Sequence, residues 1–154
     1  MRRLFAIPLG IILCLLVGFS ASFFQVEALA VWYPLLQKPL LMPPNIVFPL
    51  AWGVLYVCMG ISFGLTLSAP AKDKLGVILL FVLQLLLNFM WSWLFFYWCN
   101  PTWGLIDLLL LDVIAILYML RSYRLSHAAS WLFVPYILWL LFATYLNGYV
   151  FWYN

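Results

Sequence analysis

A few polar and aromatic side chains lie deep in long apolar stretches of the sequence, and these are the residues that could do chemistry. They include Trp52, Asn88 and Trp139. Polar groups inside an apolar environment are costly and are usually kept for function or for contacts between helices. Asp107 and Asp112 lie roughly 140° apart around a helix, so they do not form the facing carboxylates of acid–base catalysis. We expect at least one of them to bond donors on neighbouring helices instead.

The rest of the sequence excludes several other kinds of site. Cys14, Cys58 and Cys99 show no CxxC spacing, so they predict neither a disulfide framework nor a metal site. His127, the one histidine in the sequence, has no second ligand near it. Because the chain also lacks a Ser/His/Asp set, a glycine-rich phosphate loop and a basic patch, we expect no catalytic residue, metal, required cofactor or nucleic-acid partner.

The remaining aromatic residues predict a slot for a flat ligand. Trp139 is followed one helical turn later by Ala143, which places a planar wall beside a gap that no side chain fills. Trp52 is followed by Tyr56 on the same face of its helix. Such slots hold ring systems by stacking and orient them through a few polar groups. The residues by themselves leave core packing open for the two tryptophans, and helix–helix hydrogen bonding open for Asn88.

Composition determines which elements must position these residues. Of the 154 residues, 69% are hydrophobic, 20% aromatic and only 7% charged, which leaves too little polar surface for a protein that faces water. Five runs are long and apolar enough to cross a bilayer as helices, at about 1.5 Å per residue. The sequence therefore predicts an all-α membrane protein, a single domain over residues 1–154 with transmembrane helices at about 4–25, 45–67, 75–98, 103–120 and 130–153.

The basic residues predict how these helices are oriented, because short cytoplasmic loops are enriched in lysine and arginine. On one side fall Arg2, Arg3, Lys72, Lys74, Arg121 and Arg124, and on the other only Lys38. We therefore expect the N-terminus in the cytoplasm, with the C-terminus and the loop at about residues 27–44 outside. A cleaved signal peptide is the alternative interpretation of the first stretch, although its apolar run is long for one.

The external loop, called the lid loop below, is rich in proline. The prolines in and just after it are Pro34, Pro39, Pro43, Pro44 and Pro49. Proline restricts the backbone and donates no hydrogen bond, so it holds irregular structure in place at low entropic cost. We expect an ordered, non-helical lid that closes a pocket at the outer mouth of the bundle.

Gly60 and Gly64 form a GxxxG motif in the second predicted helix. Such a motif lets two helix backbones approach closely. The sequence leaves open whether the partner is another helix of the same chain or a second copy of the protein.

Four blocks of sequence carry a family resemblance. They are WYPLLQKPLLMPP at 32–44 with Trp52 after it, NFMW at 88–91, WGLIDLLL at 103–110 and WLFVPYILWLLFATYLN at 131–147. In this order they resemble the signature of the TspO/MBR or translocator protein family, which includes the peripheral benzodiazepine receptor and bacterial tryptophan-rich sensory proteins. The resemblance implies a five-helix membrane bundle, often a homodimer, that binds porphyrin or haem. In animal members it also implies binding of cholesterol, isoquinoline-carboxamides and benzodiazepine-type drugs.

The resemblance also implies a set of ligand-binding positions. On this chain they are Tyr33, Pro43, Trp52, Tyr56, Asn88, Trp91, Asp107, Trp139, Ala143 and Leu146. Two departures from the family pattern change what is expected. Residues 146–154 lack the basic residue that ends the sterol-recognition segment of animal members, which counts against sterol binding. Leu41-Met42 replaces the usual Trp-His or Trp-Thr before the double proline, so contacts between lid and ligand are expected to differ.

These observations favour one function and leave two others open. The favoured one is a bacterial membrane protein that binds porphyrin or haem in order to sequester, transport or sense it, without transforming it. The second is an enzyme-like breakdown of porphyrin driven by light or oxygen, in which Trp52 and Trp139 would be redox-active stacking partners. The third is a regulatory subunit whose ligand switches its contacts with another membrane protein. Active transport is disfavoured because no inverted repeat and no charged relay through the inner leaflet is present in the sequence.

Overall fold

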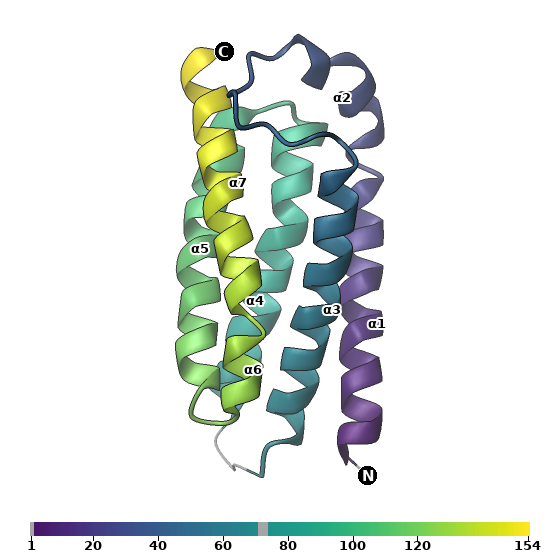
Figure 1. Ribbon diagram of the computed structural model, residues 1–154, viewed down its shortest axis with the longest axis vertical. Coiled ribbons are helices and arrows are strands. Elements are labelled where there is room, and N and C mark those ends of the chain that lie inside the picture. The colour runs from purple at the N-terminus through teal and green to yellow at the C-terminus, as the bar shows by residue number, and fades with distance from the viewer. Residues whose placement is uncertain (1, 71–73) are drawn as a thin grey trace.

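The computed structural model describes residues 2–70 and 74–154, in which all regular structure is helical (Figure 1). The long helices run along the bundle as α1 (Arg2–Ser22), α3 (Val47–Ser68), α4 (Leu75–Ser92), α5 (Pro101–Ser122) and α7 (Val134–Tyr153). The short elements are α2 (Val26–Val31), the 3₁₀ turn η1 (Tyr33–Leu35), the π-helical turn η2 (Trp93–Tyr97) and α6 (His127–Trp131). Five segments are long and apolar enough to cross a membrane, which confirms the predicted all-α, five-span architecture.

The bundle has two recognisable ends. The C-terminus, α2 and the lid loop lie at one end, called the lid end below, and α6 and the start of α1 lie at the other (Figure 1). The two termini therefore lie at opposite ends of the bundle, as an odd number of spans requires.

The lid loop differs in part from the prediction. The first long helix ends at Ser22, and the chain then forms α2 and η1 before it becomes irregular. Residues 26–31 contain no proline and include good helix formers, so a short helix forms where a non-helical lid was expected. Pro49 lies in the first turn of α3, where its missing N–H is not needed, so it belongs to the helix start rather than to the lid.

The GxxxG motif brings α3 against α1 of the same chain. A Cβ at Gly60 would collide with the backbone of Gly10 and Ile11, and a Cβ at Gly64 would collide with that of Ile7. Only hydrogen fits between the two backbones at these positions. The motif therefore serves a helix contact inside the chain, which is one of the two partners that the sequence left open.

The connection from α4 to α5 is tight. The last turn of α4 widens into the π-helical turn η2, and Cys99 then adopts a positive φ of 48°. Asn100 caps α5, because its side-chain oxygen accepts hydrogen bonds from the backbone N–H groups of Thr102 and Trp103, each at 3.1 Å. Pro101 occupies the first helical position, where no N–H is required. The connection lies between the predicted spans at 75–98 and 103–120.

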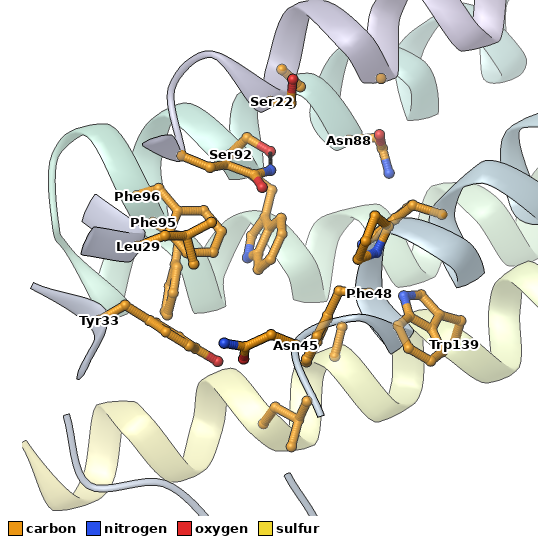
Figure 2. A pocket seen from close by; sticks show the side chains of 18 of the residues that line it. Ser22, Leu29, Tyr33, Asn45, Phe48, Asn88, Ser92, Phe95, Phe96 and Trp139 are labelled. Carbon is orange, nitrogen blue, oxygen red and sulfur yellow. Dashed lines mark hydrogen bonds between the residues drawn. The ribbon is translucent and has the colours of Figure 1, made fainter. Parts of the chain in front are cut away.

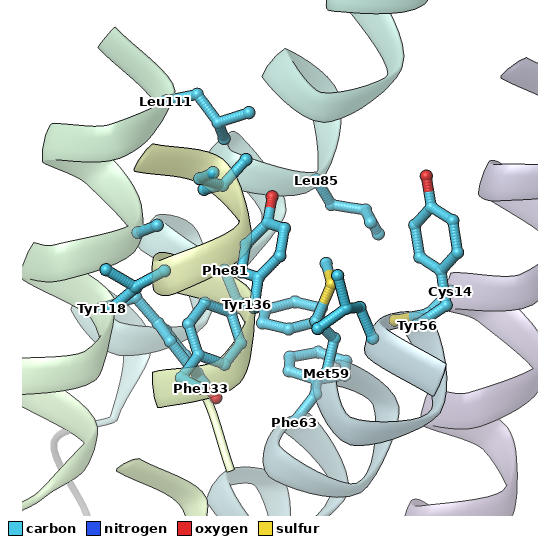
Figure 3. Close-up of a cluster of buried hydrophobic side chains, with 14 of the residues drawn as sticks. Cys14, Tyr56, Met59, Phe63, Phe81, Leu85, Leu111, Tyr118, Phe133 and Tyr136 are labelled. Atoms are coloured by element: carbon cyan, nitrogen blue, oxygen red, sulfur yellow. The ribbon is translucent and has the colours of Figure 1, made fainter. Parts of the chain in front are cut away.

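Close-packed aromatic side chains fill the middle of the bundle on the side of α6 (Figure 3). Phe63 stacks on Phe81 with ring centroids 4.1 Å apart, and Phe81 lies 5.3 Å from Tyr118. The Tyr118 hydroxyl lies 3.0 Å from the hydroxyls of both Ser62 and Thr66, so its polar end is satisfied inside the core. This part of the bundle is filled by side chains, and the cavity described below lies toward the lid end.

Candidate ligand-binding cavity

A cavity of about 820 Å³ lies beneath the lid between α1, α3, α4 and α7 (Figure 2). Its walls are mainly aromatic and aliphatic, with a few polar side chains among them. Cavities that bind small molecules typically measure about 300–1,000 Å³ and have this kind of lining. The size and lining therefore suit a large organic ligand.

Most of the residues expected at the site are brought together here. The cavity is lined by Tyr33, Trp52, Tyr56, Asn88, Trp91, Trp139, Ala143 and Leu146. Two expected residues, Pro43 and Asp107, are not among the lining residues. Met42 and Asn45 line the cavity on either side of Pro43 in the chain, and Asp107 belongs to α5, which packs against α4 and α7 and does not reach the cavity. For these two residues a role in ligand binding stays a prediction that the cavity lining does not support.

Trp52 is at the centre of the aromatic wall. Its ring stacks on Tyr56 with centroids 5.6 Å apart and an interplanar angle of 29°. Trp91 lies 6.5 Å away at a similar tilt, and Trp139 lies 6.4 Å away and nearly perpendicular, at 85°. Ala143 is buried one turn beyond Trp139 and lines the same cavity. The aromatic pair on α3 and the Trp139–Ala143 pair on α7 thus line one cavity, with the two tryptophans in edge-to-face contact.

Asn88 forms the polar floor of the cavity. It accepts a hydrogen bond from the Tyr56 hydroxyl to its Oδ1 at 2.6 Å, and its Nδ2 donates to the Tyr136 hydroxyl at 3.1 Å. These bonds join α3, α4 and α7 through one amide side chain that is only 2% exposed. Asn88 thus bonds helices together, the alternative that the sequence left open, and at the same time borders the cavity. Both roles apply to this residue.

Asn147 holds another wall of the cavity in place. Its Oδ1 accepts a hydrogen bond from the Trp91 indole N–H at 3.2 Å, and its Nδ2 donates to the Pro101 carbonyl at 2.8 Å. A side chain at Gly104 would crowd Asn147, since a Cβ there would lie 2.8 Å from its Oδ1. The orientation of the Trp91 ring in the cavity is therefore set by a buried hydrogen bond between helices.

One of the two intramembrane aspartates has an observed structural partner. Thr144 on α7 donates from its hydroxyl to Oδ2 of Asp112 at 2.8 Å. This confirms that at least one aspartate bonds a donor on a neighbouring helix, although the donor is a hydroxyl rather than an indole or a backbone N–H. Asp107 is buried outside the cavity lining, and its Oδ2 has no hydrogen-bond partner among the described residues.

The contribution of α1 was missed by the sequence analysis. Gly18 and Ser22 of α1 line the cavity together with Gln25 in the turn after α1, and Gln25 donates from Nε2 to the Ser92 hydroxyl at 3.0 Å. Gly18 leaves room for the Tyr56 ring, which a Cβ at this position would overlap. The available signal was a row of small and polar residues at helical spacing in an otherwise bulky helix.

The lid loop is held over the cavity by several contacts of its own. Gln37 donates its backbone N–H to Oδ1 of Asn154 at 2.8 Å, and Asn154 donates from Nδ2 to the Gln37 carbonyl at 3.2 Å. The Tyr33 hydroxyl lies 3.5 Å from the Met42 sulfur, and the Lys38 ammonium lies 4.6 Å from the centre of the Tyr33 ring. Burial raises the pKa of the Tyr33 hydroxyl, which therefore stays a neutral donor at the cavity mouth.

Comparison with known proteins agrees with this architecture. A model of the TspO/MBR family matches residues 10–153. The chain is 39% identical over 148 residues to the tryptophan-rich protein TspO of Chlorobaculum tepidum, covering 95% of this chain and 94% of that protein. It is 40% identical over 138 residues to TspO of Archaeoglobus fulgidus, covering 90% of each. It is 37% identical over 119 residues to the human translocator protein, covering 75% of this chain and 70% of that protein. With five apolar helices and a match that spans nearly its whole length, the chain is a multi-pass membrane protein that belongs to the TspO/MBR family.

Proposed function

We propose that this protein binds a tetrapyrrole, porphyrin or haem, in the cavity beneath the lid, and thereby sequesters, transports or senses it. The observation that carries this proposal is the aromatic slot, in which Trp52, Trp91 and Trp139 surround a gap beside Ala143. A flat macrocycle suits such a site, because its face can stack on one ring while the nearly perpendicular Trp139 ring meets it edge to face. The same slot also suits smaller flat compounds of the isoquinoline-carboxamide and benzodiazepine types.

The polar groups of the cavity favour a ligand with acidic substituents at one edge. Lys38 lines the cavity at the lid and is the only basic residue of the lid loop. The propionate groups of a porphyrin would reach this ammonium and the aqueous side, while the ring remains between the tryptophans. The proposal requires no further cofactor, because stacking holds an iron-free porphyrin and a haem alike.

Titration of the purified protein with protoporphyrin IX tests the proposal. We expect saturable quenching of tryptophan fluorescence, because several indoles line the cavity and would contact the ligand. A free isoquinoline-carboxamide should compete with the porphyrin for the same cavity. Quenching that increases linearly with porphyrin and shows no competition would indicate partition into the detergent or lipid, and would contradict a specific site.

Replacing Lys38 with methionine should weaken protoporphyrin IX binding by about threefold. This is the size expected for a partly exposed ion pair of about 0.6 kcal/mol, since the methionine keeps an apolar stem but loses the charge. The matched control is the dimethyl ester of the same porphyrin, which has no carboxylates and should bind both proteins equally. An equal loss for acid and ester would show that Lys38 acts through packing and not through its charge.

An enzyme-like breakdown of porphyrin is the second candidate function. The observation that favours it is the contact between Trp52 and Trp139 at 6.4 Å, which places two oxidisable indoles at the cavity wall. In that case the porphyrin would be photosensitiser and substrate, with dissolved oxygen as the oxidant. A regulatory role would instead be supported by a membrane partner that co-purifies in stoichiometric amount.

Exchanging Trp139 for phenylalanine should separate binding from such chemistry. Phenylalanine keeps an aromatic wall, so we expect porphyrin affinity to fall by only about 1 kcal/mol, the scale of one aromatic contact. If the indole takes part in the reaction, loss of the porphyrin Soret band under light should slow far more than occupancy explains. The measurement compares the wild type, the Trp139 variant and Trp52→Phe at saturating porphyrin, and equal bleaching rates in all three would exclude the enzymatic candidate.

We also propose that the lid end faces the outside of a bacterial cell membrane, with the N-terminus in the cytoplasm. The excess of basic residues at the other end supports this orientation. In a background with the exposed Cys99 changed to serine, Leu40→Cys should react with an impermeant thiol reagent added to intact cells. His127→Cys, which is exposed in α6, should react only after the cells are opened. The reverse pattern would overturn this orientation.

A further inference from the structure

A second hollow lies on the outer surface of the bundle, between α3 and α7. This groove has a volume of about 670 Å³ and is lined only by apolar side chains, including those of Leu50, Ala51, Val54 and Leu138. Leu50, Val54 and Leu138 are each more than 60% exposed. Because the groove lies between two membrane-spanning helices, the hydrocarbon of the bilayer faces it.

The groove and the ligand cavity share a wall. Trp139 and Phe142 line both hollows, and both side chains are only half-buried. Their ring centroids lie 5.8 Å apart, and Phe48 packs edge-on against Trp139 at 5.9 Å. The partition between the cavity and the lipid therefore includes side chains that contact both spaces. Displacement of these two rings would join the two hollows.

The Trp139 ring lacks the kind of hydrogen bond that holds Trp91 in place. No hydrogen bond to its indole is found in the described part of the chain, whereas the Trp91 indole is held by Asn147 at 3.2 Å. Ala143, one turn away, leaves room for the ring to rotate into the cavity. The surrounding helices add little restraint, because α3 packs closely along α1 but touches α7 only lightly. Rotamer changes of this kind need no movement of the backbone.

The route through the lid is more firmly closed. Both backbone polar groups of Gln37 are bonded to the Asn154 side chain, at 2.8 and 3.2 Å. The Tyr33 hydroxyl contacts Met42 across the lid, and both residues line the cavity. A ligand that left the cavity through the lid would have to break these polar contacts. A ligand that left toward the groove would have to displace only apolar contacts.

We infer that the ligand of the cavity enters from and returns to the bilayer sideways, through the groove between α3 and α7, with Trp139 and Phe142 as the side chains that open and close the passage. The occupant of the groove is thus the flat, membrane-dissolved ligand in transit. The inference rests on the proposed function, since it needs a ligand that partitions into the bilayer and binds in the cavity. Continuity between cavity and groove through the shared rings is the observation that supports it.

Leu138→Trp tests the passage, because it fills the groove without adding to the cavity lining. In lipid nanodiscs, the change of the Soret band after mixing with protoporphyrin IX reports association, and transfer to excess empty vesicles reports dissociation. We expect both rates to fall by about tenfold, with the dissociation constant within about twofold of wild type, because an obstacle in a path raises the barrier from both sides equally. Leu141→Trp, on another exposed face of α7, is the matched control and should leave both rates unchanged.

Two further variants keep the test decisive. Ala51→Trp obstructs the groove from the α3 side and should reproduce the slowing if Leu138→Trp proves unstable. Asn154→Ala removes one attachment of the lid while the contact between Tyr33 and Met42 stays, so it should leave the rates unchanged under our inference, whereas a route through the lid predicts faster exchange. Normal rates in both groove variants, or equal slowing in the Leu141 control, would overturn the lateral passage while leaving porphyrin binding intact. Absence of saturable binding in the wild type would instead overturn the proposed function.

Discussion

Replacing Ala143 with phenylalanine should weaken porphyrin binding by about tenfold to a hundredfold while the bundle remains folded. The new ring would occupy the gap beside Trp139, and overpacking of this kind typically costs about 1–3 kcal/mol. Ala143 lines the cavity, so the added volume competes directly with the ligand. Fluorescence titration with protoporphyrin IX measures the affinity, and far-UV circular dichroism with a thermal melt verifies the fold.

A serine at position 143 provides the control for this experiment. Serine is close to alanine in size and should leave the slot open, so its affinity should remain near that of the wild type. If a well-folded Ala143→Phe protein binds porphyrin as tightly as wild type, the ligand does not occupy the space between Trp139 and the aromatic residues of α3. The cavity beneath the lid would then have to be rejected as the porphyrin site.

Gly60→Leu should cause the largest loss of stability of any single substitution considered. A side chain at this position meets the backbone of Gly10 and Ile11 on α1, which cannot move aside as a flexible side chain could. We expect the free energy of unfolding to fall by about 3 kcal/mol or more, the upper range for overpacked positions. Unfolding of the purified protein by increasing SDS in mixed micelles, followed by circular dichroism, measures the change.

Gly76→Leu is the matched control for this substitution, because a Cβ at Gly76 on α4 meets nothing within 4 Å. Its effect should be small and set by helix propensity alone. The pair of variants also bears on the homodimer that the family resemblance implies. If Gly60 serves a contact between two copies, Gly60→Leu should give a stable, folded monomer on size-exclusion chromatography. An unfolded or strongly destabilised protein agrees with the contact to α1 that the structure shows.

The sequence by itself determined the membrane helices, because their formation depends on properties that are local in the chain. Backbone groups in hydrocarbon find no water to bond, so an apolar run of sufficient length satisfies them by becoming a helix, whichever helices surround it. The break between α4 and α5 was equally local, since Asn100 caps the next helix and Pro101 starts it. The short helix α2 was overlooked because the prolines farther along the lid loop dominated its interpretation.

Part of the cavity was determined by the sequence as well. Trp139 and Ala143, like Trp52 and Tyr56, share one face of their own helix because helical spacing requires it. Helical spacing does not show that these two helix faces border the same cavity. The structure shows this, because residues of both faces line it. Tyr33, in the lid, could be expected there only from the family resemblance.

The tertiary structure decided which of these faces meet. Asn88 and Asp107 are both polar and deep in the sequence, yet Asn88 borders the cavity while α5, which carries Asp107, packs behind α4 and α7. In the same way, Gly60 needed α1 as its partner, and Gly18 became part of the site only because α1 lies beside α3. A periodic pattern tells on which side of its own helix a residue lies. Which helix packs against that side depends on contacts between residues far apart in the chain. Close backbone approach, buried hydrogen bonds and aromatic packing must all be satisfied together by the same arrangement of helices.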